Sequence, residues 1–447
     1  MATHVHALKL SRFVVPAGLV LQGPDRLPKR LLFGTRQARV FMIAEDAWVA
    51  LKAGQIGALS QTATEELARA EVLVPAHEDE VKTVVDRNRA AISSNDELYQ
   101  VIQPTASCQL ACSYCGQEHH AQSLSTADQS SFIARVREKI AGGEYRRLRV
   151  GWFGGEPLSG LQVLRSMSVR LQECARESGC SYSSKIVTNG VALTESVAKE
   201  LVDEHRVQEI EVTLDGLAAD HDCRRPTKSG GPSFDRIMAN LEALASRSDL
   251  DVHVTVRCNV DKSNADGVSL LIEKIATLGS RLSFYVAPVH SWGNDAHLNA
   301  LSPEDFGARE IEWLTQMISL GMNPRLLPTV RPIVCMAVQP DAELIDAYGN
   351  VFNCTEVSYV PKYQETFTIR AAGGEKDDSR WRILGSFNDK ILAGKYPCSE
   401  CAMLPVCGGR CPKQWAEGVA PCPSAKFNIG DRLRLFHAMQ VRSAESA

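Results

Sequence analysis

Between residues 98 and 288, short apolar segments alternate with longer stretches in which apolar positions recur every three or four residues. The short segments predict strands, and the longer stretches predict amphipathic helices. The expected strands are residues 99–104, 148–153, 185–188, 209–214, 252–259 and 282–288. The expected helices are residues 130–141, 161–177, 195–204, 234–246 and 265–278. This alternation predicts an α/β fold with a parallel sheet and right-handed crossovers. Six units are too few for a closed eight-stranded barrel, so we expect an open, partial barrel.

Thr194 and Ser233 precede two of these helices and are expected to act as N-caps. Upstream of the barrel, short strands are expected at 5–9, 31–33 and 39–43, and helices at 45–52 and 63–70. These elements predict a small α+β unit over residues 1–95. The barrel is then expected over 96–325, a cysteine-rich domain over 326–430 and a C-terminal tail over 431–447.

Composition excludes several classes of protein. Hydrophobic residues make up 44% of the 447 residues and charged residues 23%, as in ordinary globular proteins. The longest nearly apolar run, 13–21, is interrupted by Pro16 and Gly18 and is too short to span a membrane. A net charge of -4 argues against a nucleic-acid surface. The N-terminus has no secretory signal pattern, so we expect a cytoplasmic protein.

Ten of the fourteen cysteines are clustered, which in a reducing compartment favours metal binding over disulfides. They are Cys108, Cys112 and Cys115 in CQLACSYC, Cys335 and Cys354, and Cys398, Cys401, Cys407, Cys411 and Cys422. Three thiolates leave one iron of a [4Fe–4S] cube free to bind a cofactor. Zinc would need a fourth ligand in the first set, which His119 or His120 could supply. The scattered Cys174, Cys180, Cys223 and Cys258 are expected to be small buried apolar residues.

Polar or glycine-rich segments follow each expected strand. CQLACSYC follows the first, GGEP (154–157) the second, TNG (188–190) the third and LDG (214–216) the fourth. Arg257 lies near the end of the fifth strand, and His290 and Trp292 follow the sixth. Because the carboxyl ends of parallel strands share one rim, these segments predict a single site there.

The CxxxCxxC loop followed by GGEP resembles the radical S-adenosylmethionine (SAM) enzymes. The C-terminal cysteines from 335 to 422 resemble the SPASM extension of that family. The resemblance covers roughly residues 98–425. It implies a partial (β/α)6 TIM-like barrel, bound SAM and three [4Fe–4S] clusters, one that cleaves SAM and two auxiliary ones.

Site residues follow from the same resemblance. Cys108, Cys112 and Cys115 would hold three irons of the SAM cluster. The SAM contacts would be Gly154, Gly155, Glu156 and Pro157 at the methionine amine, Asn189 at the ribose, Tyr114 at the adenine and Arg257 at the carboxylate. The alternative for Arg257 is an ordinary ion pair at the sheet edge.

The two auxiliary clusters would divide the remaining cysteines. Cys398, Cys401, Cys407 and Cys422 would hold one, and Cys335, Cys354 and Cys411 the other. The second set lacks a fourth cysteine, so Asp341, another side chain or water would complete it. Taken alone, the CxxCx5CxxxC run is also typical of a zinc ribbon.

The implied activity is reductive cleavage of SAM to a 5′-deoxyadenosyl radical that abstracts a hydrogen from a ribosomally made precursor peptide. The product would be a cross-link (a carbon–carbon cyclophane, an ether or a thioether) or a related oxidation. The alternatives are a sulfatase-maturating enzyme that forms formylglycine, and an iron–sulfur redox sensor or binding module.

The resemblance also implies partners and a proton acceptor. Residues 1–95 would bind the leader segment of the precursor peptide, with a structural lid or a dimer contact as the alternatives, and a flavodoxin or ferredoxin would donate electrons. Glu356, two residues after Cys354, is the expected base, whereas Asp346 is expected to shape a turn.

Overall fold

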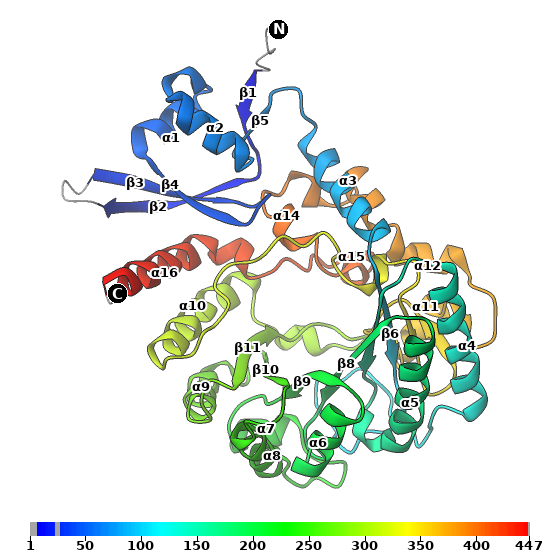
Figure 1. Ribbon diagram of the computed structural model, residues 1–447. Coiled ribbons are helices and arrows are strands. Elements are labelled where there is room, and N and C mark those ends of the chain that lie inside the picture. The colour runs from blue at the N-terminus through cyan, green and yellow to red at the C-terminus, as the bar shows by residue number, and fades with distance from the viewer. Residues whose placement is uncertain (1–6, 23–26, 446–447) are drawn as a thin grey trace.

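A nine-stranded sheet forms the centre of the computed structural model, which describes residues 7–22 and 27–445 (Figure 1). Its strand order is β11-β10-β9-β8-β7-β6-β12-β13-β14. The first six run parallel in sequence order, which confirms the predicted α/β partial barrel. They are β6 (Glu97–Ile102), β7 (Arg147–Trp152), β8 (Ser181–Thr188), β9 (Val207–Thr213), β10 (His253–Val260) and β11 (Leu282–Pro288).

Helices cover the outer side of this sheet, and most of them bury an apolar face against it (Figure 1). They are α4 (Thr126–Gly142), α5 (Leu161–Glu177), α6 (Glu195–Asp203), α7 (Ala218–Arg224), α8 (Phe234–Ser246) and α9 (Val268–Ala276). The short helix α7 was not expected from the sequence.

The two expected N-caps differ in outcome. Thr194 caps α6 by accepting a hydrogen bond from the Val197 amide. The prediction for Ser233 is wrong, because its hydroxyl donates to the Arg225 carbonyl at 2.8 Å instead. The Asp222 carboxylate accepts from the amides that begin α8 and takes over the capping role.

The cysteine-rich region continues the barrel sheet. Strand β12 (Glu343–Ile345) pairs in parallel with β6 and is followed by β13 (Asn350–Phe352) and β14 (Arg370–Ala371). The barrel sheet therefore continues into the region beyond the boundary expected at residue 326. The helices of this region are α11 (Pro361–Phe367), α12 (Asp378–Gly385), α13 (Phe387–Leu392), α14 (Leu404–Cys407) and α15 (Pro412–Ala416).

The N-terminal unit contains two small antiparallel sheets and three α-helices. Strands β2 (Val14–Gln22), β3 (Leu27–Gly34) and β4 (Arg39–Ala44) form one sheet, and β1 (Leu8–Leu10) pairs with β5 (Leu73–Pro75). The helices are α1 (Glu45–Lys52), α2 (Gln61–Arg69) and α3 (Glu80–Ser93). The strand expected at 5–9 begins outside the described residues. Strand β2 was not expected because Pro16 and Gly18 interrupt it, and its register shifts between Pro16 and Leu19.

The C-terminal segment expected to be a tail belongs instead to helix α16 (Ala425–Glu445). This helix packs against β2 and against α10 (Pro303–Ser319), and it buries Leu433 completely. Within residues 7–22 and 27–445, no helix is long and apolar enough to cross a membrane.

Candidate active site and cysteine sites

The loop between β6 and α4 carries the first three cysteines and is anchored by neighbouring segments. The amides of Ala111 and Ser113 donate to the carbonyls of Pro226 and Arg224, at 2.8 and 2.9 Å. The Glu118 amide donates to the Tyr359 carbonyl at 2.7 Å. A pocket of about 470 Å³ opens beside this loop and is lined by Cys108, Cys112 and Cys115 together with residues from GGEP, TNG and the ends of β10 and β11.

The three thiols of this loop lie close together. Burial raises the pKa of Cys108 to about 12, and the Glu156 carboxylate and the Cys112 thiol add to the effect. Burial likewise raises the pKa of Cys115 to about 11, again with a contribution from Cys112. Three thiols that line one pocket supply a ligand set for a metal or metal–sulfur group.

GGEP lies against the cysteine loop. A side chain at Gly155 would come within 2.6 Å of the Ser107 carbonyl, so the close approach requires glycine. The buried carboxylate of Glu156 accepts hydrogen bonds from the Thr188 hydroxyl and from the Asn189 and Leu158 amides, at 2.7, 2.7 and 3.0 Å. Glu156 thus braces TNG against GGEP, whereas Pro157 begins the following 3-10 turn. The sequence did not predict this bracing role.

Tyr114 belongs to the cysteine loop itself, and Asn189 lies beside it. The Asn189 amide nitrogen is directed at the Cys108 sulfur, 3.8 Å away, and its oxygen accepts from Gln109. The Tyr114 ring packs under the Arg224 guanidinium, 5.2 Å from the ring centre. Its hydroxyl accepts from Arg225 and, at 3.1 Å, from Asn259, so a polar network fixes the ring.

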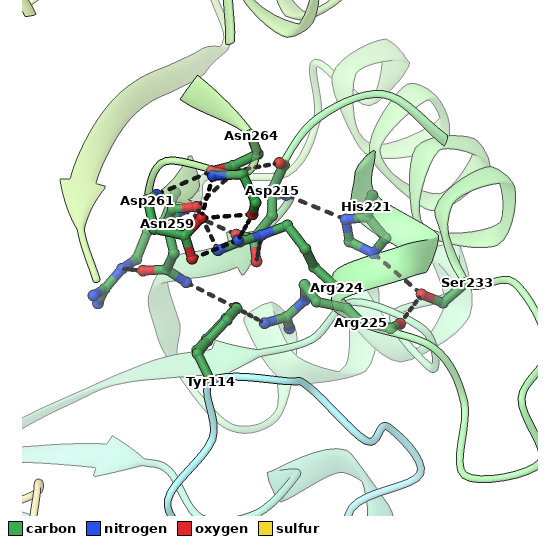
Figure 2. Close-up of polar contacts among 11 residues, drawn as sticks. Tyr114, Asp215, His221, Arg224, Arg225, Ser233, Asn259, Asp261 and Asn264 are labelled. Atoms are coloured by element: carbon green, nitrogen blue, oxygen red, sulfur yellow. Dashed lines mark hydrogen bonds and ion pairs between the residues drawn. The ribbon is translucent and has the colours of Figure 1, made fainter. Parts of the chain in front are cut away.

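Sequence reasoning missed Arg225, the buried centre of that network (Figure 2). Arg225 lines the pocket, its Nη1 donates to Tyr114, and its Nε has no hydrogen-bond partner among the described residues. Burial would lower its pKa, but Cys112, Tyr114 and Asp215 raise it well above the usual value. A buried cation with an unused donor beside the cysteine loop suits an anionic ligand group. The HDCRR run (221–225) was the available signal.

Neighbouring ion pairs hold this network in place. Arg224 Nη1 donates to Asp261 at 2.7 Å, and Asp215 accepts from the Asn259 amide at 2.9 Å. Figure 2 shows Arg224 among these acidic and amide groups, while Arg225 turns toward Tyr114. Asp215 belongs to the LDG segment and lies 3.7 Å from the Arg224 guanidinium. This segment therefore helps to orient Arg224 in addition to forming the turn after β9.

Arg257 lies farther along the pocket wall and is already paired. Its Nε donates to Asn259 at 2.8 Å, and its Nη1 lies 3.7 Å from the Glu211 carboxylate on the neighbouring strand. This is the sheet-edge ion pair considered as the alternative. Of the two arginines, Arg225 is therefore the one that keeps a buried donor unpaired among the described residues.

Glu356 lines the same pocket and connects it to the second set of cysteines. Its carboxylate lies 3.2 Å from His290 Nε2, its carbonyl accepts from the Trp292 indole at 2.7 Å, and its amide donates to the Cys354 sulfur at 3.4 Å. Partial burial would raise the pKa of Glu356, but the hydrogen bond to His290 and the nearby cations hold it below the usual value. The carboxylate is therefore ionised at neutral pH. Asp346 shapes the 346–350 turn, as expected.

The structure brings together both expected sets of auxiliary cysteines. Burial raises the pKa of Cys354 well above its usual value, and the thiols of Cys411 and Cys335 raise it further. We call these three the inner cysteine site. A separate hollow is lined by Cys398, Cys401, Cys407 and Cys422, which we call the outer cysteine site. Burial raises the pKa of Cys398 to about 12, with contributions from the other three thiols.

The donor chemistry of these sites fits iron–sulfur clusters. The described residues contain no group of three or more Cys, His, Asp or Glu arranged for a single metal ion. All-thiol sets around a pocket or hollow suit a larger metal–sulfur group. Asp341 is engaged away from the inner site, since its carboxylate accepts from the Tyr145 hydroxyl at 2.6 Å. Of the scattered cysteines, Cys174 and Cys258 are buried as expected, whereas the expectation is wrong for Cys180, which is half-buried, and for Cys223, which is exposed.

Comparison with known proteins agrees with this geometry. Residues 102–262 match the radical SAM superfamily. The chain contains a radical SAM domain. It is 23% identical over 356 residues to a serine-type anaerobic sulfatase-maturating enzyme of Bacteroides thetaiotaomicron, covering 71% of this chain and 83% of that protein. It is 26% identical over 177 residues to one of Klebsiella aerogenes, covering 39% and 42%.

Solved structures share the fold. The chain matches anSMEcpe with bound AdoMet at a TM-score of 0.54 and 17% identity, over 78% of this chain and 96% of that one. The same protein with bound AdoMet and the Cp18Cys peptide matches at a TM-score of 0.53 and 18% identity, over 78% and 99%. The radical SAM domain implies a [4Fe–4S] cluster and SAM, and the cysteine loop and GGEP are the parts of this chain that fit them.

Proposed function

We propose that this radical SAM enzyme modifies a ribosomally made precursor peptide and installs a cross-link or a related oxidation. The observation that carries the proposal is the pocket itself. The same pocket is lined by Cys108, Cys112 and Cys115 and by Glu356, whose amide donates to Cys354 of the inner cysteine site. A substrate in this pocket would be near both a radical source and an electron acceptor.

The residues of the chain have distinct proposed roles. When bound, SAM and its cluster would supply a 5′-deoxyadenosyl radical that removes a hydrogen atom from the peptide. Gly154 and Gly155 bring backbone close to the methionyl group, and Arg225 pairs with its carboxylate. Asn189 and Tyr114 border the ribose and adenine, and Glu356 accepts the proton released when the product forms.

The proposed cofactors are three [4Fe–4S] clusters, with the inner and outer cysteine sites each holding an auxiliary one. A flavodoxin or ferredoxin is the proposed electron donor, and the N-terminal unit the proposed contact for a leader segment. The relative solved with a bound peptide supports a peptide substrate.

Formylglycine formation on a sulfatase is the second candidate, favoured by the curated relatives. The cross-linking reaction, the first candidate, is favoured by the inner cysteine site. Its three cysteines lie together without a fourth, and Asp341, considered as a fourth ligand, is bound to Tyr145 instead.

Anaerobic incubation with SAM, dithionite and peptides tests the proposal. If the enzyme installs a cross-link, the reaction should yield 5′-deoxyadenosine. With the cognate precursor peptide it should also yield a peptide product lighter than the unmodified peptide by about two hydrogen masses. Formylglycine on a sulfatase peptide would establish the second candidate instead. If the reconstituted protein forms no 5′-deoxyadenosine, both candidates fail.

A further inference from the structure

We infer that the N-terminal unit is a structural part of the outer cysteine site, so that it cannot be removed without disturbing that site, whether or not it also contacts a leader segment. The inference rests on the proposed function only for the identity of the metal group. In Figure 1 the blue N-terminal elements lie directly against the orange segment that carries α14. Three of the four cysteines of the outer site lie in or beside that segment, at 398, 401 and 407.

Two buried apolar clusters cross this boundary. Phe13 and Val85 of the N-terminal unit are completely buried in the same cluster as Cys398 and Leu404. Phe33 is completely buried in a second cluster, which contains Met403 and Val406. Met403 and Leu404 also line the hollow between the four cysteines. The N-terminal unit therefore packs against residues that line the outer cysteine site.

A buried polar contact fixes the register of this boundary. The Thr35 hydroxyl donates to the carbonyl of Ala402, next to Cys401, at 2.6 Å. Thr35 is completely buried, and its amide donates to the Phe13 carbonyl at 2.9 Å. On helix α3, buried Asn88 donates to buried Asn388 of α13 at 3.4 Å. Unpaired polar groups are costly in such a setting, so these contacts hold the two segments in one arrangement.

The segment from 397 to 407 has little structure of its own to hold the cysteines. It contains a 3-10 turn at Pro397–Glu400 and the four-residue helix α14, and helices this short are not stable alone. Its order therefore depends on its surroundings, which include helix α13, the N-terminal unit and any metal bound at the outer cysteine site. Two factors that stabilise one arrangement support each other reciprocally. Deletion of residues 1–95 would disturb the outer site, so a deletion cannot by itself locate peptide binding.

The substitution Thr35→Val tests this coupling in the full-length, reconstituted protein. It removes the hydroxyl that donates to the Ala402 carbonyl at 2.6 Å and also lies 3.0 Å from the Phe13 carbonyl, whereas Thr35→Ser keeps a hydroxyl. Thr64→Val, on α2, removes only a hydrogen bond to the Ser60 carbonyl and serves as the control. In Thr35→Val we expect the iron of the outer cysteine site, about a third of the total, to be lost to a chelator roughly tenfold faster than in the wild type. Thr35→Ser and Thr64→Val should lose this iron at close to the wild-type rate.

Two further measurements distinguish a loss of this coupling from a general folding defect. Phe33→Leu should show the same selective loss to a smaller degree, and hydrogen exchange should rise in residues 397–407 of both variants. Reciprocally, Cys398→Ser with Cys422→Ser should raise exchange in β2 and β3. Metal loss and exchange at the wild-type rate in Thr35→Val and Phe33→Leu would overturn the coupling. A wild-type chain that binds no metal at these four cysteines would contradict the proposed cofactor, and the exchange measurements would still decide the coupling.

Discussion

At the residue scale, the two pocket arginines differ in what already binds them. Among residues 7–22 and 27–445, the Arg225 Nε has no hydrogen-bond partner, whereas Arg257 is paired with Glu211 and Asn259. We therefore expect Arg225→Gln to weaken SAM binding at least about tenfold, since a hydrogen bond between charged partners contributes roughly 1.5–3 kcal/mol. Arg257→Gln should change affinity less than about twofold. Equilibrium dialysis with labelled SAM measures both, and the reverse ranking would return the carboxylate to Arg257.

Glu356 is expected to act after SAM cleavage. Its carboxylate faces the pocket and is ionised, and the isosteric Glu356→Gln change removes the proton acceptor while keeping the side chain's shape. Deuterium from labelled peptide should still appear in 5′-deoxyadenosine, while finished product falls by about 10²-fold or more. Mass spectrometry follows both. Normal product yield in this variant would remove Glu356 from the mechanism and leave the radical SAM assignment intact.

At the element scale, the cysteine loop depends on a contact with the segment after β11. A side chain at Gly116 would lie 1.6 Å from the Trp292 carbonyl, and this clash is with backbone and cannot be relieved by a rotamer change. The Trp292 indole is itself held by Glu356. We expect Gly116→Ala to displace the loop and lower iron content by about one third, with loss of 5′-deoxyadenosine formation. Gly57→Ala, where the added methyl meets nothing within 4 Å, is the matched control. Full iron content in Gly116→Ala would show that the loop adapts.

The elements themselves were predictable to different degrees for physical reasons. Strands β6 to β11 were evident because buried parallel strands are continuous apolar runs between amphipathic helices. Strand β2 was missed because Pro16 and Gly18, which normally mark turns, are accommodated by a shift in register. The Ser233 cap failed because a buried tertiary hydrogen bond to Arg225 competes with local capping. Local patterns therefore located the rim segments, but not the partners that each segment binds.

At the scale of the whole molecule, the metal sites were predictable and their surroundings were not. Cysteine spacing marked the clustered residues, and the family resemblance implied how they divide into two auxiliary sets, whose thiols the structure places together. The roles of Arg225 and Glu156 arise from contacts between segments tens of residues apart. The attachment of the N-terminal unit to the outer site joins Thr35 to Ala402, a contact that no periodicity encodes. Long-range packing is thus where sequence reasoning failed.

The separation of the three cysteine sites leads to a final prediction about metal content. The cysteine loop lies between β6 and α4, whereas the inner and outer sites are built from residues 335–422. Changing Cys108, Cys112 and Cys115 together to Ala should lower iron from about 12 to about 8 per chain and abolish 5′-deoxyadenosine formation. The fold should persist, because the loop is anchored by backbone hydrogen bonds to Pro226, Arg224 and Tyr359 that do not involve the thiols. Iron analysis, circular dichroism and SAM-cleavage assays on one preparation check all three expectations. Continued SAM cleavage by that variant would place the cleaving cluster elsewhere, and loss of all the iron would show that the three sites assemble only together.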